Sequence, residues 1–291
     1  MTKRIEVTNS GTLWTVGLVC FAAACVARPA GAAPVLPDFS PANFPDGATI
    51  TNPYFPLTPG TTYRASGNVT DPEDGSTVHE LDVDTVTSRT INIAGVAARV
   101  VHAQGFEDGV LAEDTKDYFA QDRSGNVWYM GEDTVSLDYD DKGNVISRNT
   151  SGSWRAGVNG AKPGFVMPTD KTIGFNYYQE FSRDDGALDQ ATTVSTTERL
   201  TVPVGTFDNV LKTREESELE PGVGEFKYYA AGIGLIRAEE DVNASGQPQT
   251  VIVLDSVRTS TSVPLPNGAW AALLSSLLLV TPRALRIALR R

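Results

Sequence analysis

The stretch that decides the fold is 90-TINIAGVAARVVHAQGFEDGVLAEDTKDYFA-120. Runs rich in β-branched and aromatic residues lie on both sides of the Asp108-Gly109 pair. Such runs favour strands, and an Asp-Gly pair tolerates the positive φ that a tight hairpin turn requires. The stretch therefore predicts two antiparallel strands, at 90–103 and 110–120.

The same pattern recurs through the rest of the region 61–258. Turn sequences such as Asp74-Gly75, Lys142-Gly143 and Asp185-Gly186 separate its short runs of Val, Ile, Thr, Tyr and Phe. No stretch keeps a 3.6-residue apolar period across three turns, so we expect few helices. The region is predicted to be all-β, a single antiparallel meander with further strands at 78–86, 127–130, 134–139, 145–154, 174–181, 191–202, 209–218, 225–229, 235–242 and 249–257.

Composition and charge limit the classes of partner. The chain has 291 residues, 41% of them hydrophobic and 21% charged, which is enough apolar material for a core. Residues 34–262 keep 17 of the 24 Lys and Arg but 35 of the 36 Asp and Glu, a net charge of −18. A surface this acidic repels nucleic acid and favours cations and basic partners. We therefore expect no nucleic-acid binding.

The N-terminal region has the features of a signal peptide. Lys3 and Arg4 precede an apolar run at 13–27, and small residues in an Ala-x-Ala arrangement follow. Signal peptidase is expected to cleave after Ala32 or Ala33; the alternative is an uncleaved N-terminal anchor. Both cysteines of the chain lie inside the apolar segment, so the exported part would have no disulfide, Cys nucleophile or Cys-ligated metal. Neither cysteine follows the Leu-like and small residues that a lipoprotein signal needs.

The C-terminal region combines a proline motif, an apolar segment and a basic end. The motif is formed by Val263, Pro264, Leu265 and Pro266, and the apolar segment covers 269–280. That segment spans only about 18 Å, so it must recruit following residues or thin the bilayer. Cytoplasmic anchoring is predicted for the arginines of the basic end, Arg283, Arg286, Arg290 and Arg291.

This tail resembles the C-terminal sorting signal of PEP-CTERM proteins, in a variant that has Leu265 where the family usually has Glu. The resemblance covers about the last 29 residues. It implies insertion into the inner membrane, cleavage near the motif by an exosortase-like enzyme, and transfer to the cell surface or to an exopolysaccharide matrix. A plain C-terminal membrane anchor is the alternative.

These features divide the chain into four parts. Residues 1–33 are the predicted signal peptide and 34–60 a Pro-rich extended linker laid over the fold. Residues 61–258 form the predicted acidic all-β domain, and 259–291 a tether with the sorting or transmembrane segment. A signal helix and a transmembrane helix are thus expected to flank the domain.

The segments 202–210 and 225–236, VPVGTFDNV and EFKYYAAGIGLI, resemble the closing strands of envelope β-sheet proteins of unknown function and of LolA-like lipoprotein carriers. The resemblance implies a curved sheet, or half-open barrel, wrapped around an apolar groove. Among the aromatic residues, Trp154, Phe175 and Tyr177 are the candidates to face such a groove, although core packing is the default role for aromatic side chains.

Catalytic and metal-binding patterns are weak. His79 and His102 are the only histidines, and no Gly-x-Ser-x-Gly motif frames a serine. A Ca²⁺ loop at 138–149 lacks the final bidentate Glu, so a hairpin turn is expected there. A crowd of acids next to aromatic residues suggests glycoside cleavage, but strand alternation divides these acids between the two faces of a solvated sheet. Those acids are Glu113, Asp114, Asp117, Asp122, Glu132 and Asp133.

The sequence thus predicts no catalytic residue, metal or cofactor. It predicts an exported structural or binding protein of the cell envelope, outer surface or matrix, anchored permanently or transiently in the inner membrane by its tail. An exopolysaccharide or an apolar ligand is the expected partner. The alternatives are a carrier of an apolar ligand in a half-barrel groove and a secreted carbohydrate-active enzyme.

Overall fold

The computed structural model describes residues 33–70, 75–140, 142–219, 222–243 and 245–260. Within these ranges the chain is all-β, as predicted, with one short 3₁₀ helix, η1 (Pro41–Asn43). No helix in them has the length and hydropathy needed to cross a bilayer. The predicted signal helix, proline motif and C-terminal arginines lie outside the described residues.

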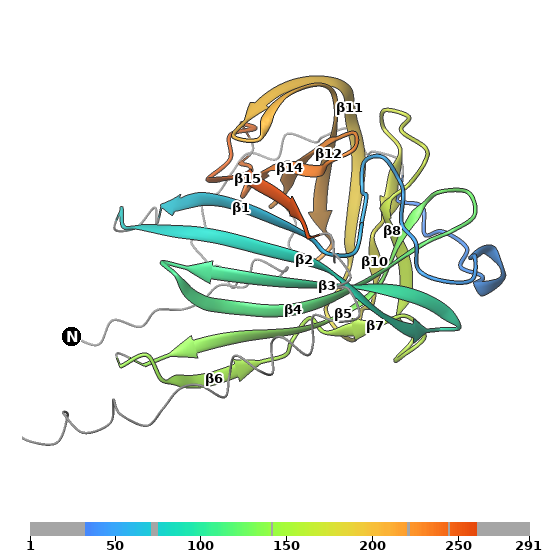
Figure 1. Ribbon diagram of the computed structural model, residues 1–291, viewed down its shortest axis with the longest axis horizontal. Coiled ribbons are helices and arrows are strands. Elements are labelled where there is room, and N and C mark those ends of the chain that lie inside the picture. The colour runs from blue at the N-terminus through green and yellow to red at the C-terminus, as the bar shows by residue number, and fades with distance from the viewer. Residues whose placement is uncertain (1–32, 71–74, 141, 220–221, 244, 261–291) are drawn as a thin grey trace, which may run out of the picture. The chain divides into compact units, whose positions relative to one another are not determined.

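All the strands belong to one antiparallel sheet (Figure 1). Their bounds are β1 (Thr61–Thr70), β2 (Thr77–Ile93), β3 (Val96–Glu107), β4 (Val110–Gln121), β5 (Val127–Tyr139), β6 (Val145–Asn149), β7 (Trp154–Arg155), β8 (Lys162–Met167), β9 (Asn176–Tyr178), β10 (Glu180–Phe181), β11 (Asp189–Val202), β12 (Gly205–Ser217), β13 (Glu225–Ala230), β14 (Gly234–Glu240) and β15 (Thr250–Thr259).

The turn at Asp108-Gly109 is confirmed, but the prediction for the deciding stretch needs one correction. Both turn residues have positive φ, 48° and 81°, and Glu107 pairs with Val110 across the hairpin. The predicted strand at 90–103 is instead divided by a second tight turn at Ala94-Gly95, with φ values of 48° and 84°. The expected break between 86 and 90 is only a register shift within β2. The sequence analysis did not predict this turn, because alanine seldom adopts the positive φ that Ala94 has here.

The sheet closes on itself through one short segment. The order is β10-β8-β5-β4-β3-β2-β1-β15-β14-β13-β12-β11-β9, and β6 and β7 also pair with β5. The two ends of this order, β9 and β10, are separated only by Gln179. Residues on either side of Gln179 therefore pair with opposite ends of the sheet, Tyr178 with β11 and Glu180 with β8. The result is a curved, nearly closed sheet with an interior.

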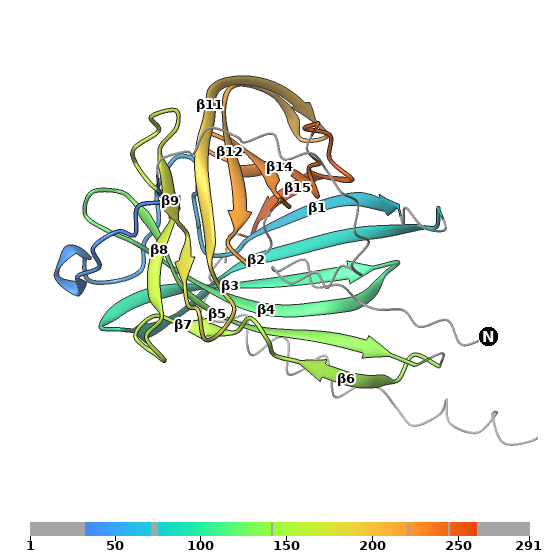
Figure 2. The same ribbon diagram turned by 180° about the vertical axis from the view of Figure 1, so that it is seen from behind.

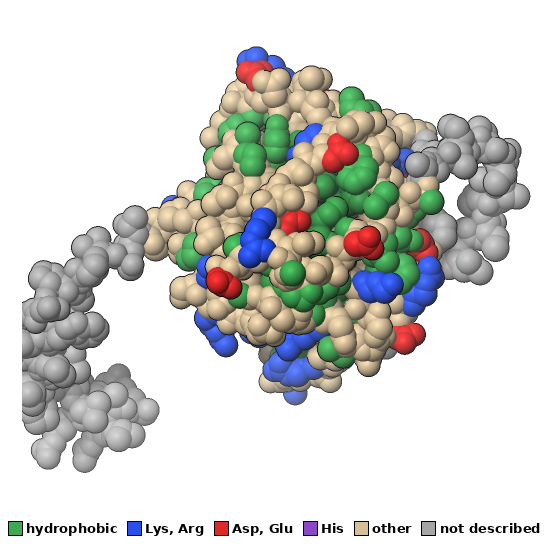
Figure 3. Space-filling view, turned by 90° about the vertical axis from the view of Figure 1, so that its right-hand side faces the viewer, with side chains coloured by type: hydrophobic (Ala, Val, Ile, Leu, Met, Phe, Trp, Pro, Cys, Tyr) green, Lys and Arg blue, Asp and Glu red, His purple; other side chains and the backbone are tan. Residues whose placement is uncertain are grey.

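The Pro-rich segment 34–60 contributes to the core. Phe44 belongs to an apolar cluster on the outer face of β3–β5, and Ile50 and Leu57 belong to a cluster on the inner face. The segment lies by the β2–β3 and β4–β5 turns, since a Cβ added at Gly95 would meet Pro41 at 3.5 Å and the Arg123 N–H donates to the Asn43 carbonyl at 2.9 Å. Figure 2 shows it as the blue chain at that end of the sheet, and Figure 3 views the molecule from that side, where hydrophobic side chains are interspersed with charged ones.

Closure leaves no room for a side chain at Gly164 in β8. A Cβ there would overlap the backbone of Tyr178 and Gln179, whereas a Cβ at Gly105 would meet its neighbours at 3.7–3.8 Å, an ordinary contact. We expect Gly164→Ala to lower the free energy of unfolding by more than about 2 kcal/mol. Gly105→Ala should stabilise slightly or be neutral. Urea unfolding of both variants tests this, and equal effects would contradict the account of closure.

Candidate functional site

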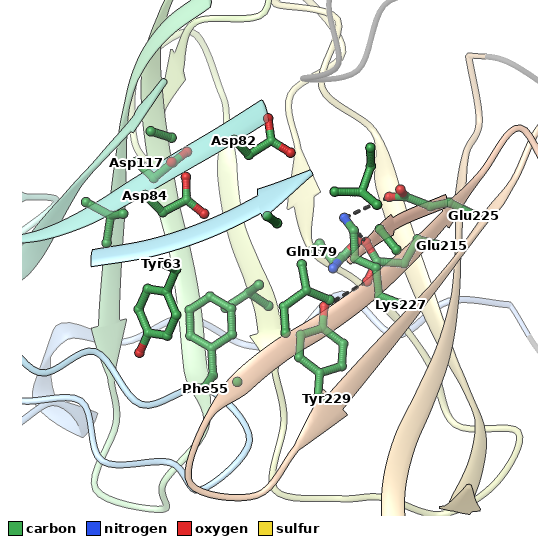
Figure 4. A pocket seen from close by; sticks show the side chains of 18 of the residues that line it. Phe55, Tyr63, Asp82, Asp84, Asp117, Gln179, Glu215, Glu225, Lys227 and Tyr229 are labelled. Atoms are coloured by element: carbon green, nitrogen blue, oxygen red, sulfur yellow. Dashed lines mark hydrogen bonds and ion pairs between the residues drawn. The ribbon is translucent and has the colours of Figure 1, made fainter. Parts of the chain in front are cut away.

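The inner face of the curved sheet lines a cavity of about 480 Å³ that is open to solvent on one side (Figure 4). Its wall comes from the inner face of many strands and from residues 55–57 of the N-terminal segment. A volume of this size is within the range of small-molecule pockets, which begins at roughly 300 Å³. The cavity is therefore the candidate functional site.

Side chains change from apolar to acidic along β2, β4, β12, β13 and β14, which line the cavity. On β4, Asp117 lies two residues before Phe119, and Glu113 lies four residues before Asp117. On β2, Asp84 and Asp82 lie two and four residues before Val86. The opposite wall has the same order, with Tyr229, Lys227 and Glu225 on β13, Leu211 and Glu215 on β12, and Ile236 and Glu240 on β14. Because these residues are two or four apart, they share one face of each strand. The cavity thus has an apolar end and an acidic end.

The apolar end lies next to the N-terminal segment and is largely aromatic. Phe55 packs edge-on against Phe119, with ring centroids 5.2 Å apart, and Phe119 stacks on Tyr129 at 5.0 Å. Tyr63 and Tyr229 complete this floor, as Figure 4 shows. Such rings offer a large apolar contact surface to a ligand.

The acidic end has twelve Asp and Glu residues among its lining, here called the acidic wall. They are Asp82, Asp84, Glu113, Asp117, Glu132, Glu180, Asp189, Glu215, Glu216, Glu225, Glu240 and Asp241. Figure 4 shows Asp82, Asp84 and Asp117 on one side of the cavity and Glu215, Glu225 and Lys227 on the other.

Lys227 is the centre of a partly buried polar network, with 27% of its side chain exposed. Its Nζ lies 2.8 Å from Glu215 and 2.7 Å from Glu225, and Tyr229 Oη donates to Glu215 at 3.3 Å. Burial alone would lower the pKa of Lys227, but Glu215 and Glu225 raise it well above its usual value. Lys227 therefore stays charged and is fully occupied by its two carboxylate partners.

The acids on the opposite side of the cavity have raised pKa values. Burial raises the pKa of Asp84 to about 6. Burial, together with Asp84 and Glu113, raises the pKa of Asp117 to about 7, although Tyr129 Oη donates to Asp117 at 2.6 Å and opposes this change. Burial and Asp117, which is directly opposite in the β4–β5 register, raise the pKa of Glu132 well above its usual range. Such opposed carboxyls are also able to act as a general acid and base.

The structure separates the acids that the sequence analysis grouped. Glu113, Asp117 and Glu132 line the cavity, so the prediction that they lie on a solvated sheet face is wrong. The others lie outside the cavity lining: Asp114 pairs with His102 at 2.8 Å and Asp133 with Arg155 at 2.5 Å. The division between faces was predicted, but alternation does not say which face curves inward.

The three aromatic residues predicted to face a groove are not among those that line this cavity. Trp154 is 3% exposed and packs edge-on against Tyr129, with centroids 5.5 Å apart. Tyr177 is 1% exposed and contacts Phe175 at 5.3 Å. The aromatic lining comes instead from Phe55, which the sequence analysis assigned to the linker, and from Tyr63, which lies on β1, a strand that the sequence analysis did not predict.

The other candidates have local structural roles. The Asp140 carboxylate accepts hydrogen bonds from the backbone N–H groups of Lys142 and Asn144, as in a capped hairpin turn. His79 contacts Asn68 at 3.3 Å.

The raised pKa values predict how stability depends on pH. Between about pH 4 and pH 7 the folded protein binds more protons than the unfolded chain, because Asp84 and Asp117 titrate later when folded. The contribution of Asp84 and Asp117 to the stability of the folded protein is fully present below about pH 4, and it is lost as pH rises through about 6 and 7. A tenfold difference in proton affinity between the folded and unfolded states corresponds to about 1.4 kcal/mol. We expect a higher Tm at pH 5 than at pH 8, and a smaller difference in Asp84→Asn/Asp117→Asn. Thermal unfolding measured by circular dichroism tests this; a Tm that rises from pH 5 to pH 8 would contradict it.

No protein-family model and no curated protein matches the chain. Solved structures that resemble it include a Bacteroides fragilis protein with a YmcC-like fold that is described, by inference, as exported (TM-score 0.38, 16% identity, 71% of this chain and 99% of that one). A Parabacteroides distasonis protein described by inference as a lipoprotein has a TM-score of 0.36 and 14% identity over 73% of this chain and 100% of that one. A DUF1329 family protein from Desulfovibrio piger has a TM-score of 0.27 and 10% identity, over 74% and 92%. Similarity at this level assigns neither a family nor a function.

Proposed function

We propose that this chain is an exported cell-envelope protein that binds a small, partly apolar ligand inside its curved sheet. The observation that carries the proposal is the cavity of about 480 Å³ with an aromatic floor. Protein interiors are normally packed with few voids larger than a water molecule, so a purely structural sheet would have a filled interior. Of the functions that the sequence leaves open, ligand binding or carriage fits this cavity best.

Binding is favoured over catalysis by the distribution of the acids. Glycoside cleavage uses two carboxyls, one neutral and one ionised, on either side of the scissile bond. Here the acids are spread over both sides of the cavity, from Asp82 on β2 to Glu225 on β13. A surface of this kind suits recognition of a whole molecule, and we assign no catalytic role to any residue.

The proposed cellular location of the protein is inferred from the sequences of its N- and C-terminal segments. The Ala-x-Ala site at Ala32 and Ala33 supports processing by signal peptidase, and the tail beginning at Val263 supports processing by an exosortase-like enzyme. Release would place the acidic domain at the cell surface or in the exopolysaccharide matrix.

A cavity-filling variant tests ligand binding. Ala103 on β3 lines the cavity between the apolar and acidic ends. Ala103→Phe is expected to abolish the fluorescence increase of the neutral apolar probe N-phenyl-1-naphthylamine, because the added ring occupies the probe's space. Ala42→Phe, at an exposed position in η1, is the matched control and should bind as the wild type does. No binding by the wild-type protein, or equal binding by Ala103→Phe, would overturn the proposal.

Intact mass of the protein isolated from its own host tests the address. We expect a mature form that begins at residue 33 or 34 and ends near Val263, recovered from the surface or matrix fraction. Deletion of the residues from Val263 onward should abolish inner-membrane association and its subsequent processing. A product that retains Arg291 in the membrane fraction would show a plain anchor instead of a sorting signal.

A further inference from the structure

The acidic wall carries far more negative than positive groups. Among the described residues that line the cavity, two are basic: Lys227, and Arg237, which pairs with Glu239 at 2.6 Å. Lys227 is already held between Glu215 and Glu225. Within the described part of the chain, Asp82, Asp84 and Glu132 form no ion pair with any basic side chain. On this side of the cavity, Asp82 and Asp84 of β2 and Glu132 of β5 thus have no basic side chain of the described chain as a counter-ion.

Glu132 provides a second sign of a missing partner. Its side chain lines the cavity, its residue is only 7% exposed, and no basic side chain among the described residues pairs with it. Burial and Asp117, which faces it across the β4–β5 register, both oppose its ionisation. A buried carboxyl without a cationic partner costs free energy, which a ligand that brings a positive charge and a hydrogen-bond donor would recover.

We infer that the ligand is an organic cation, with a protonated amine or guanidinium group joined to an apolar body. The cationic nitrogen would lie among Asp84, Asp117 and Glu132 and donate hydrogen bonds to their carboxyls. The apolar body would lie on the rings at the other end of the cavity, namely Phe55, Tyr63, Phe119, Tyr129 and Tyr229. This inference rests on the proposed function and names the chemical class of its ligand.

The arrangement of apolar and acidic side chains along the strands determines which end of the ligand is charged and which is apolar. Apolar and acidic side chains occupy successive positions of the same strands, so the two ends of the cavity are separated by about two to four strand residues, or roughly 7–13 Å. An amphipathic molecule that extends along the strands satisfies both ends at once. Charged nitrogens close to the aromatic end would also gain from the ring faces.

A metal ion fits the site less well than an organic cation. No three His, Cys, Asp or Glu side chains in the described ranges are grouped closely enough to hold one jointly. A small hard cation needs about six oxygen ligands around a single point, whereas these carboxyls are distributed around a chamber. Burial also opposes ionisation of the acidic wall, and a cation bound in the cavity would offset this penalty for Asp84 and Asp117.

Three probes with the same chain and different head groups test the inference: decylamine, 1-decanol and decanoate. Each would be titrated against the purified domain loaded with N-phenyl-1-naphthylamine at pH 8. We expect decylamine to displace the probe at a concentration about tenfold or more below that of 1-decanol, because a charge-assisted hydrogen bond adds to the shared apolar contact. Decanoate should be the weakest, because it brings another negative charge.

Two conservative variants and a control separate the head-group site from the fold. Glu132→Gln and Asp84→Asn should weaken decylamine at least about tenfold and leave 1-decanol unchanged. Asp255→Asn, at an exposed position of β15, should alter neither. Displacement by decanol or decanoate as effective as by decylamine would overturn the cationic assignment while leaving the proposed function intact. Loss of 1-decanol binding in both variants would likewise overturn it, because the carboxyls would then be supporting the fold.

Discussion

The structure depends on the closure of the sheet through residues 176–181. The chain leaves β9 beside β11, passes Gln179, and enters β10 beside β8, so a single short segment joins the two ends of the sheet order. The Gln179 N–H donates to the Asp189 carbonyl at 2.8 Å, and Val35 of the N-terminal segment bridges to Tyr177 along the other edge. Closure of this kind removes exposed edges, and it converts one face of the sheet into an enclosed lining. Without it, the acids of β2, β4 and β5 would face open solvent.

Enclosure has an energetic cost that a purely structural protein has no reason to bear. Burial raises the pKa of Asp84 and Asp117 towards neutrality, and it also raises the pKa values of Glu132 and Glu180 well above their usual range. Stability lost in this way is common where a site is prepared for a partner that supplies the missing interaction. The outer clusters compensate: Phe44, Tyr118, Trp128 and Met130 are buried on the opposite face of the same strands. The domain thus keeps part of its apolar core outside the sheet, and the inside has the space that the proposed ligand needs.

Much of the architecture was predictable from local patterns, but the site was not. Alternating runs and Asp-Gly turns predicted the antiparallel meander, and the hairpin at Asp108-Gly109 is confirmed. The spacing Asp82-x-Asp84-x-Val86, repeated as Asp117-x-Phe119, was visible in the sequence. Such spacing places acids and large apolar residues on one face, as in a lined interior, yet Tyr118 and Ala120 make the other face of β4 apolar too. The period of two therefore could not decide which face is enclosed. That choice follows from contacts distant in sequence, such as Gly164 against Tyr178.

A crystal structure of the domain with decylamine tests the central claim most directly. The account predicts density for the alkyl chain between Phe55 and Tyr229, with the nitrogen within hydrogen-bonding distance of at least two carboxyls of the acidic wall. Decylamine bound only on the outer surface, or an interior filled by rearranged side chains, would contradict it.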